Sequence, residues 1–280
     1  MKNSKQGMKF ELKMRKGAKG TEDMSIQKTI SLSDPTPKIH WLSKSRLRFY
    51  KYEELPAYLQ DNVYIKSGYR AYYSTKESWI SFFHLHNESW NVWLHAFGFF
   101  VFVAGIAHTW WAEIHPLIEF EERFILTILQ CCASYTMLFS SLFHLHTCIS
   151  KETSHWYGCL DYSGISATIA GGTISAMYFL LHCEGHFRTA SLILLGLVNL
   201  VGIVGPMFEV WSKGEFRTYR ALLYIASGAF AIIPVSYFVI KNGLGHLPSI
   251  SENPALVWMG LMVAMYLIGA YFYVNQIPER

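Results

Sequence analysis

Three polar residues stand at helical spacing around the start of the first long apolar stretch. Glu88, Asn91 and His95 fall at i, i+3 and i+7, so a helix would place them along one face. Ionisable groups in apolar segments are costly, which makes each a candidate for function. Two interpretations stay open: a hydrogen-bonded cluster that fixes the start of the helix, which we favour, and a cluster that supports a ligand or a metal.

A second polar group spans the end of one apolar stretch and the start of the next. Ser140 and His144 share a face at i, i+4, and Asp161 opens the following stretch. Successive membrane helices are antiparallel, so we expect His144 and Asp161 at the same depth. Imidazole is a common zinc ligand, often oriented by a carboxylate. Zinc with open coordination needs three protein ligands, so spacing favours a hydrogen bond between helices over a metal site.

The chain that must position these residues is strongly apolar. It has 280 residues, of which 51% are hydrophobic and 16% are charged, whereas about 25% charged residues are usual in soluble domains. A bilayer core of about 30 Å needs about 20 apolar residues per helix. Six stretches qualify: Asn91–Trp111, Phe124–His146, Cys159–His182, Ala190–Trp211, Leu222–Ile240 and Ala255–Val274. We therefore expect an all-α integral membrane protein with six transmembrane helices.

Charge divides the chain into three parts. Residues 1–45 are rich in Lys, Ser and Thr without an apolar period, which predicts a disordered basic tail. Residues 46–90 read as a juxtamembrane segment and residues 91–280 as the transmembrane helical domain. Of the 24 Lys and Arg residues, 16 precede Asn91, so the N-terminus and the two parts of the chain before Asn91 should be cytosolic.

We expect the lipid bilayer as a partner and no nucleic acid. Five cysteines without a CxxC pair exclude a disulfide scaffold.

Four motifs carry a resemblance to a known family: Glu88-x-x-Asn91-x-x-x-His95, Ser140-x-x-x-His144, Leu160-Asp161-Tyr162-Ser163-Gly164-Ile165 and Gln276-Ile277-Pro278-Glu279-Arg280. Together they resemble the progestin and adipoQ receptor (PAQR) family from about Tyr50 to Arg280. The resemblance implies a seven-helix membrane protein with a cytosolic N-terminus, in agreement with the charge distribution.

The resemblance also implies a zinc ion held by three histidines near the cytosolic face. His144 matches the first ligand, Asp161 the carboxylate that contacts the zinc-bound water, and Ser140 the serine beside it. The other two ligands belong to a His-x-x-x-His pair in the seventh helix, and this chain stops at Arg280 before that helix. We therefore expect a bundle without its last helix, which a truncated isoform or an incomplete gene model would explain. The alternative function is a zinc-dependent lipid amide hydrolase of the ceramidase type. Because the chain offers one zinc ligand of three, this alternative is disfavoured, and enzymatic activity stays open.

Within the family, the juxtamembrane segment is most similar to a Golgi member that traps Raf kinase, and adiponectin-receptor-like members differ more here. This implies a receptor-like or scaffold protein of the Golgi membrane, in preference to the plasma membrane, that binds Raf kinase and restrains MAP kinase signalling. A sterol, lipid or adipokine-like ligand is a further expectation. A transporter is disfavoured, because the apolar stretches show no clear internal repeat. The candidate partner-binding residues are Tyr52, Pro56, Asp61, Asn62, Gly68, Tyr69 and Arg70.

Overall fold

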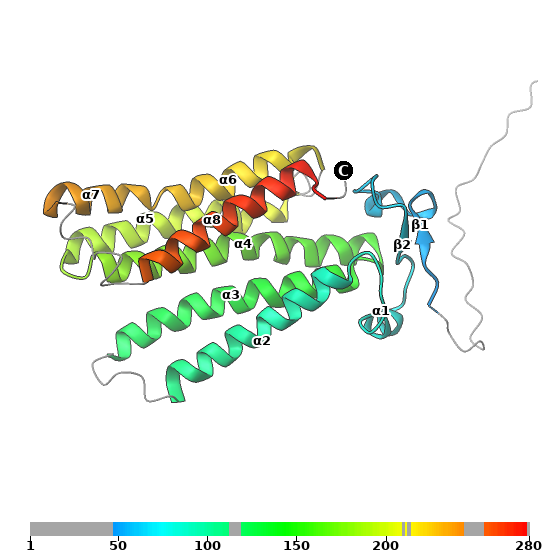
Figure 1. The fold of residues 1–280 in the computed structure, drawn as a ribbon, viewed down its shortest axis with the longest axis horizontal. Coiled ribbons are helices and arrows are strands. Elements are labelled where there is room, and N and C mark those ends of the chain that lie inside the picture. The colour runs from blue at the N-terminus through cyan, green and yellow to red at the C-terminus, as the bar shows by residue number, and fades with distance from the viewer. Residues whose placement is uncertain (1–46, 112–118, 209–210, 212–213, 244–254, 279–280) are drawn as a thin grey trace, which may run out of the picture. The chain divides into compact units, whose positions relative to one another are not determined.

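The structure is a computed structural model that describes residues 47–111, 119–208, 211, 214–243 and 255–278. The predicted tail, residues 1–45, lies outside these ranges. The described chain is mostly helical, which confirms the predicted all-α fold class (Figure 1).

Residues 47–88 fold into a small unit ahead of the long helices, here called the juxtamembrane unit. Strands β1 (Tyr50–Lys51) and β2 (Ser67–Tyr69) pair antiparallel. Two 3-10 turns, η1 (Tyr52–Glu54) and η2 (Ala57–Leu59), follow β1 and precede β2. The segment that the sequence predicted to be juxtamembrane is therefore compactly folded.

The juxtamembrane unit has a core of its own. Leu55, Tyr69 and Ala71 are buried together, and partly buried side chains pack around them: Tyr50, Tyr52, Leu59 and Ile65. Gly68 has φ +84°, a left-handed conformation that glycine adopts without strain. Its carbonyl accepts a hydrogen bond of 3.0 Å from the backbone N–H of Asn87. Strand β2 is thereby tied to the chain just before the first long helix.

Helix α1 (Thr75–Ser81) ends this unit and begins at a capping box. The Ser74 hydroxyl accepts from the backbone N–H of Glu77, and the Glu77 carboxylate accepts from the backbone N–H of Ser74. Farther along α1, the Ser78 hydroxyl donates to the carbonyl of Leu145 at 2.7 Å. Helix α1 therefore rests on the C-terminal end of a long helix.

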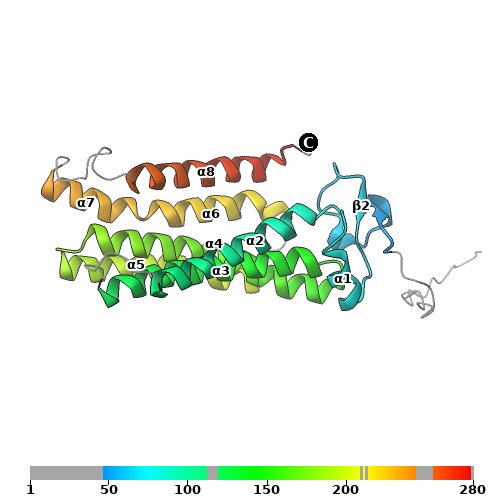
Figure 2. The same ribbon diagram turned by 60° about the horizontal axis from the view of Figure 1, so that its bottom comes forward.

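The remaining described elements are long helices and short 3-10 turns: α2 (Ser89–Trp111), α3 (Phe120–His146), α4 (Lys151–Leu180), α5 (Gly185–Val204), η3 (Gly205–Met207), η5 (Gly214–Phe216), α6 (Arg217–Ala229), α7 (Ile232–Asn242) and α8 (Ala255–Asn275). Helix α3 packs between α2 and α4, and α4 also packs against α5 and α6 (Figures 1 and 2). Helix α8 packs against α6.

Small residues allow α3 and α4 to approach closely. A Cβ on Gly164 would lie 2.9 Å from Cα of Thr136, which is closer than real Cβ contacts. The Thr136 hydroxyl donates to the carbonyl of Gly164 at 2.6 Å, and its oxygen lies 2.6 Å from that of Thr168. The small-residue pattern of α4 thus brings the two backbones together, as it does between membrane helices generally.

The predicted spans correspond to helices in the structure. Among the described residues, four helical segments are long and apolar enough to cross a membrane: Ser89–Trp111, Phe120–His146, Gly185–Met207 and Arg217–Lys241. They coincide with four of the six predicted spans, although the last is divided into α6 and α7. The predicted span Cys159–His182 lies largely in the 30-residue helix α4, whose first turns are polar. The sixth, Ala255–Val274, coincides with α8, which is apolar over Gly260–Asn275.

Candidate functional site: a polar cluster beside a large cavity

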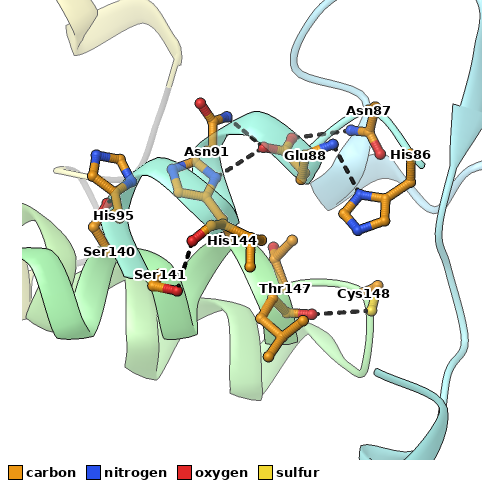
Figure 3. A network of polar contacts seen from close by, with 12 residues as sticks. His86, Asn87, Glu88, Asn91, His95, Ser140, Ser141, His144, Thr147 and Cys148 are labelled. Atoms are coloured by element: carbon orange, nitrogen blue, oxygen red, sulfur yellow. Dashed lines mark hydrogen bonds and ion pairs between the residues drawn. The ribbon is translucent and has the colours of Figure 1, made fainter. Parts of the chain in front are cut away.

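An ion pair joins the start of α2 to the end of α3. Glu88 directly precedes α2, and its carbonyl accepts the backbone N–H of Val92 at 3.0 Å. Its carboxylate therefore stands at a helix N-terminus, where negative charge is favoured. His144 lies in the last turn of α3. Nδ1 of His144 is 2.9 Å from Oε2 of Glu88 (Figure 3), so the protonated ring nitrogen donates to the carboxylate.

Other polar residues extend this pair into a cluster, here called the Glu88–His144 cluster. Asn91 Nδ2 donates to Oε2 of Glu88 at 2.7 Å. The ring of His95 stacks on that of His144, with centroids 5.8 Å apart. Ser140 Oγ lies 3.1 Å from Nδ1 of His95. The two polar groups that the sequence singled out separately are therefore one cluster (Figure 3).

Asp161 joins this cluster from α4 without being the hydrogen-bond partner of His144 seen here. Its carboxyl interacts electrostatically with His144 and His95, and it lines the same cavity as these residues and Ser140. The proximity of Asp161 to His144 agrees with the expectation that the two residues lie at the same depth. Nδ1 of His144 nevertheless pairs with the carboxylate of Glu88 and not with that of Asp161, because the start of α2 lies directly against the end of α3.

The electrostatics of the cluster favour an ionised Glu88. Burial opposes ionisation, but hydrogen bonds and charge from His144, and a further hydrogen bond from Asn91, outweigh it and lower the carboxyl pKa of Glu88 to about 2. The side chains of Glu88 and His144 keep 23% and 21% of their surface exposed, and both line the cavity described below. Glu88 thus holds His144 with a full negative charge.

A buried arginine fixes the end of α3 next to the cluster. Arg70 is 2% exposed, and its guanidinium donates to the carbonyls of His144 at 2.6 Å and Leu145 at 3.0 Å. A third bond reaches the Ser81 hydroxyl at 2.7 Å. The last carbonyls of a helix lack partners within the helix and attract positive charge. Arg70 therefore caps α3 and joins it to the juxtamembrane unit.

His86 and His146 lie near this region but have other partners. Nδ1 of His86 accepts the backbone N–H of Glu88 at 3.0 Å. Burial and the charge of Arg70 lower the pKa of His86 to about 3, so its ring is neutral. Nδ1 of His146 is 2.9 Å from Ser78 Oγ, which already donates to a carbonyl and so accepts here. Both histidines are therefore structural, and only His144 and His95 face each other in the cluster.

A large cavity adjoins the Glu88–His144 cluster. Its volume is about 2770 Å³. At one end it is lined by Glu88, His95, His144 and Asp161, and farther along by apolar side chains such as Met137. Other apolar walls come from α4, α6 and α8. The arrangement can hold an elongated amphiphile, with hydrogen-bonding groups at one end and an apolar channel beyond them.

The seven candidate partner-binding residues differ in burial. Tyr69 and Arg70 are buried and bonded within the fold, since the Tyr69 hydroxyl donates to the carbonyl of Asn62 at 3.0 Å. Asp61 is 66% exposed and pairs with Arg217 of α6 at 2.8 Å. Half-buried positions complete the set: Tyr52, Pro56, Asn62 and Gly68. The surface that a partner could reach is therefore formed by Asp61 and the half-buried residues.

Two arginines have structural roles that the sequence does not predict. Arg70, a candidate for partner binding, also caps α3. Arg220, which is 5% exposed, donates to the Tyr273 hydroxyl of α8 at 2.9 Å and lies 4.9 Å from the ring of Tyr162 in α4. A charged residue in an apolar or aromatic stretch of sequence indicates that its side chain needs a partner, but the sequence does not identify that partner.

The described residues do not by themselves form a zinc site. In its neutral form His144 has the arrangement expected of a ligand, because one ring nitrogen then donates to a carboxylate and the other is an acceptor. Among the described residues, however, no three side chains of His, Cys, Asp or Glu are grouped so that they could hold a metal ion. The described part of the chain therefore supplies one candidate zinc ligand, and metal binding by His144 stays a prediction.

Comparison with known proteins agrees with this architecture. Residues 83–280 match the haemolysin-III-related family. Heptahelical transmembrane protein 1 of Arabidopsis thaliana is 31% identical, over 84% of this chain and 71% of the relative. Progestin and adipoQ receptor-like protein 1 of Caenorhabditis elegans is 28% identical, over 92% and 59%. Progestin and adipoQ receptor family member 3 of Homo sapiens is 29% identical, over 84% and 75%. The motifs, the helical membrane fold and these matches together show that the chain belongs to the haemolysin-III-related family of multi-pass membrane proteins, which includes the progestin and adipoQ receptors.

Proposed function

We propose that this protein is a receptor-like scaffold of the Golgi membrane, with a cytosolic N-terminus, that binds Raf kinase through its juxtamembrane unit and restrains MAP kinase signalling. The folded juxtamembrane unit is the observation that carries the proposal. It has its own core around Leu55 and is fixed to the membrane domain by Arg70. A folded unit held beside a membrane bundle presents a preorganised surface, which lowers the entropic cost of binding a partner.

The cavity supports the receptor-like part of the proposal. Its polar end, at Glu88 and His144, suits the head group of a lipid or sterol, and its apolar length suits the remainder of such a molecule. Arg70 binds the carbonyl of His144 and, with Asp61 and other residues of the juxtamembrane unit, lines the cavity. If ligand binding moves His144, Arg70 would move with it, and the surface proposed to bind the kinase would change its position.

The test uses the full chain in lipid nanodiscs and the purified catalytic domain of Raf kinase. We expect saturable binding to the wild type. The double variant Asp61→Ala and Asn62→Ala changes the accessible part of the proposed surface, and we expect it to weaken affinity at least about tenfold, the effect of about 1.4 kcal/mol. Lys241→Ala is the control, because Lys241 pairs with Glu184 at the end of α7 rather than with the juxtamembrane unit.

Two results would contradict the proposal. One is a wild-type chain that does not bind the kinase domain, and the other is equal loss of binding in Lys241→Ala and the double variant. Location is tested separately, by following a fluorescent fusion of the full chain in cells with Golgi and plasma-membrane markers. Protease protection of an N-terminal tag in sealed vesicles tests the cytosolic orientation.

A further inference from the structure

Helix α1 has its polar and apolar sides reversed relative to a surface helix of a water-soluble protein, in which the apolar side is buried. Its buried side carries serines, since Ser78 and Ser81 are fully buried. Its outward side carries Trp79, which is 51% exposed. The turn that follows exposes Phe83 by 82% and Leu85 by 75%. Small polar residues thus face the protein, and three large apolar residues face outward beside the exposed Thr75, Lys76 and His84.

The buried serines are satisfied, which explains why this orientation is stable. Ser78 donates to the carbonyl of Leu145, and Ser81 donates to the carbonyl of Ser78 at 2.6 Å while it accepts from Arg70. These bonds fix the rotation of α1, because turning the helix would leave buried donors and acceptors without partners. The rings of Trp79 and His146 pack in a T-shaped arrangement, with centroids 5.1 Å apart. Its exposed face is therefore imposed by the fold.

The outward apolar residues are continuous with a membrane-spanning helix. Helix α2 begins only four residues after Leu85, and Trp93 near its start donates its indole N–H to the carbonyl of Phe82 at 2.7 Å. An exposed apolar stripe then runs along α2 at helical spacing: Trp90, Leu94, Phe97 and Val101. The turn after α1 is thus held rigidly against the end of a helix whose exposed side suits lipid.

We propose that residues 75–85 lie in the head-group region of the bilayer, with Trp79, Phe83 and Leu85 inserted among the lipids. Tryptophan and phenylalanine are favoured at this depth, and a short apolar face beside a spanning helix gains by leaving water. The partner of this surface is therefore phospholipid. Arg70 and Ser81 then connect lipid contact at α1 to the end of α3, so the juxtamembrane unit is positioned by the membrane as well as by the bundle.

Fluorescence quenching in vesicles can test this contact. The full chain is reconstituted in phosphatidylcholine vesicles, with or without lipid brominated on the upper acyl chain. The signal of Trp79 is the difference between the wild type and Trp79→Phe, which keeps an aromatic ring at this exposed position. We expect brominated lipid to quench this signal, and iodide in the water to quench it at least about threefold less than it quenches a tryptophan in water.

A matched control places tryptophan elsewhere on the juxtamembrane unit. Tyr64 is exposed and lies between η2 and β2, so Tyr64→Trp in the Trp79→Phe background should be quenched by iodide and not by brominated lipid. Strong iodide quenching of Trp79 without lipid quenching would overturn the proposal. Protection of Trp79 from both quenchers would also overturn it, in favour of burial against another protein. Phe83→Ser gives an independent measurement, because its loss of lipid contact should increase iodide quenching of the neighbouring Trp79.

Discussion

The carboxylate of Glu88 and the imidazole of His144 are 56 residues apart in the chain and 2.9 Å apart in the structure. Their contact joins the start of α2 to the end of α3, and Asn91 adds a second hydrogen bond to the same carboxylate oxygen. The pair therefore determines both how two membrane helices meet and how the histidine presents its other nitrogen to the cavity.

Replacing Glu88 by Gln keeps its shape and removes its charge. We expect Glu88→Gln to lower the free energy of unfolding by about 1.5–3 kcal/mol, the usual value of a hydrogen bond to a charged group. Thermal unfolding of the detergent-solubilised protein measures the effect. Glu152→Gln is the matched control, because it makes the same chemical change in the first turn of α4, outside the cluster. Equal melting temperatures for Glu88→Gln and the wild type would contradict the prediction.

The stabilisation by Glu88 should depend on pH in a defined direction. Its folded pKa of about 2 lies below the ordinary value of 4.5. A group with a depressed pKa stabilises the fold above its unfolded pKa and loses that contribution as pH falls through the folded value. We therefore expect the stability difference between the wild type and Glu88→Gln to be full above about pH 5 and to shrink towards pH 2. A difference that stays constant over this range would argue against the ion pair.

Helical spacing predicted which residues would share a face, but it could not predict how the helices are rotated against one another. The i, i+3, i+7 pattern correctly grouped Glu88, Asn91 and His95, since hydropathy and the helical period define membrane helices well. The partner of His144 depends on how α2 packs on α3, so spacing favoured Asp161 and the structure has Glu88. The position of Arg70 was equally beyond prediction, because a contact 74 residues away in the chain leaves no periodic signal.

Arg70 should be sensitive even to a change that keeps its charge. Lysine cannot form the forked bonds that the guanidinium makes to the carbonyls of His144 and Leu145. We expect Arg70→Lys to destabilise the protein by about 1–3 kcal/mol and to increase hydrogen exchange in residues 67–81. Arg48→Lys is the control, since the side chain of Arg48 is 70% exposed. Unchanged exchange in Arg70→Lys would show that the juxtamembrane unit is held by other contacts.

The ion pair between Asp61 and Arg217 should couple the juxtamembrane unit weakly to α6. Asp61 is largely exposed, so water and salt screen the pair, and a double-mutant cycle with Asp61→Asn and Arg217→Gln should give a coupling energy of about 0.2–1 kcal/mol. Raising the ionic strength from about 0.05 M to about 1 M should remove most of it, because the screening length falls to about 3 Å. A coupling that is insensitive to salt would mean that the two residues interact by another route.

Two glycines of the same helix should respond differently to alanine. In α4, a Cβ on Gly164 would lie 2.9 Å from the backbone of Thr136, whereas a Cβ on Gly172 would meet nothing within 4 Å. Backbone cannot move aside as a side chain can, so we expect Gly164→Ala to separate α3 from α4 and to cost about 1–3 kcal/mol. Gly172→Ala should leave stability unchanged or raise it by up to about 1 kcal/mol, because alanine favours the helix.

The separation of α3 from α4 in Gly164→Ala should also change the geometry of the Glu88–His144 cluster, because Asp161 and Gly164 lie one turn apart on the same face of α4. We therefore expect Gly164→Ala, and not Gly172→Ala, to abolish most of the stability difference that Glu88→Gln produces in the wild-type background. Thermal unfolding of the two double variants measures this coupling. If Glu88→Gln costs the same in both glycine backgrounds, then the approach of α3 to α4 supports the bundle without positioning the Glu88–His144 cluster.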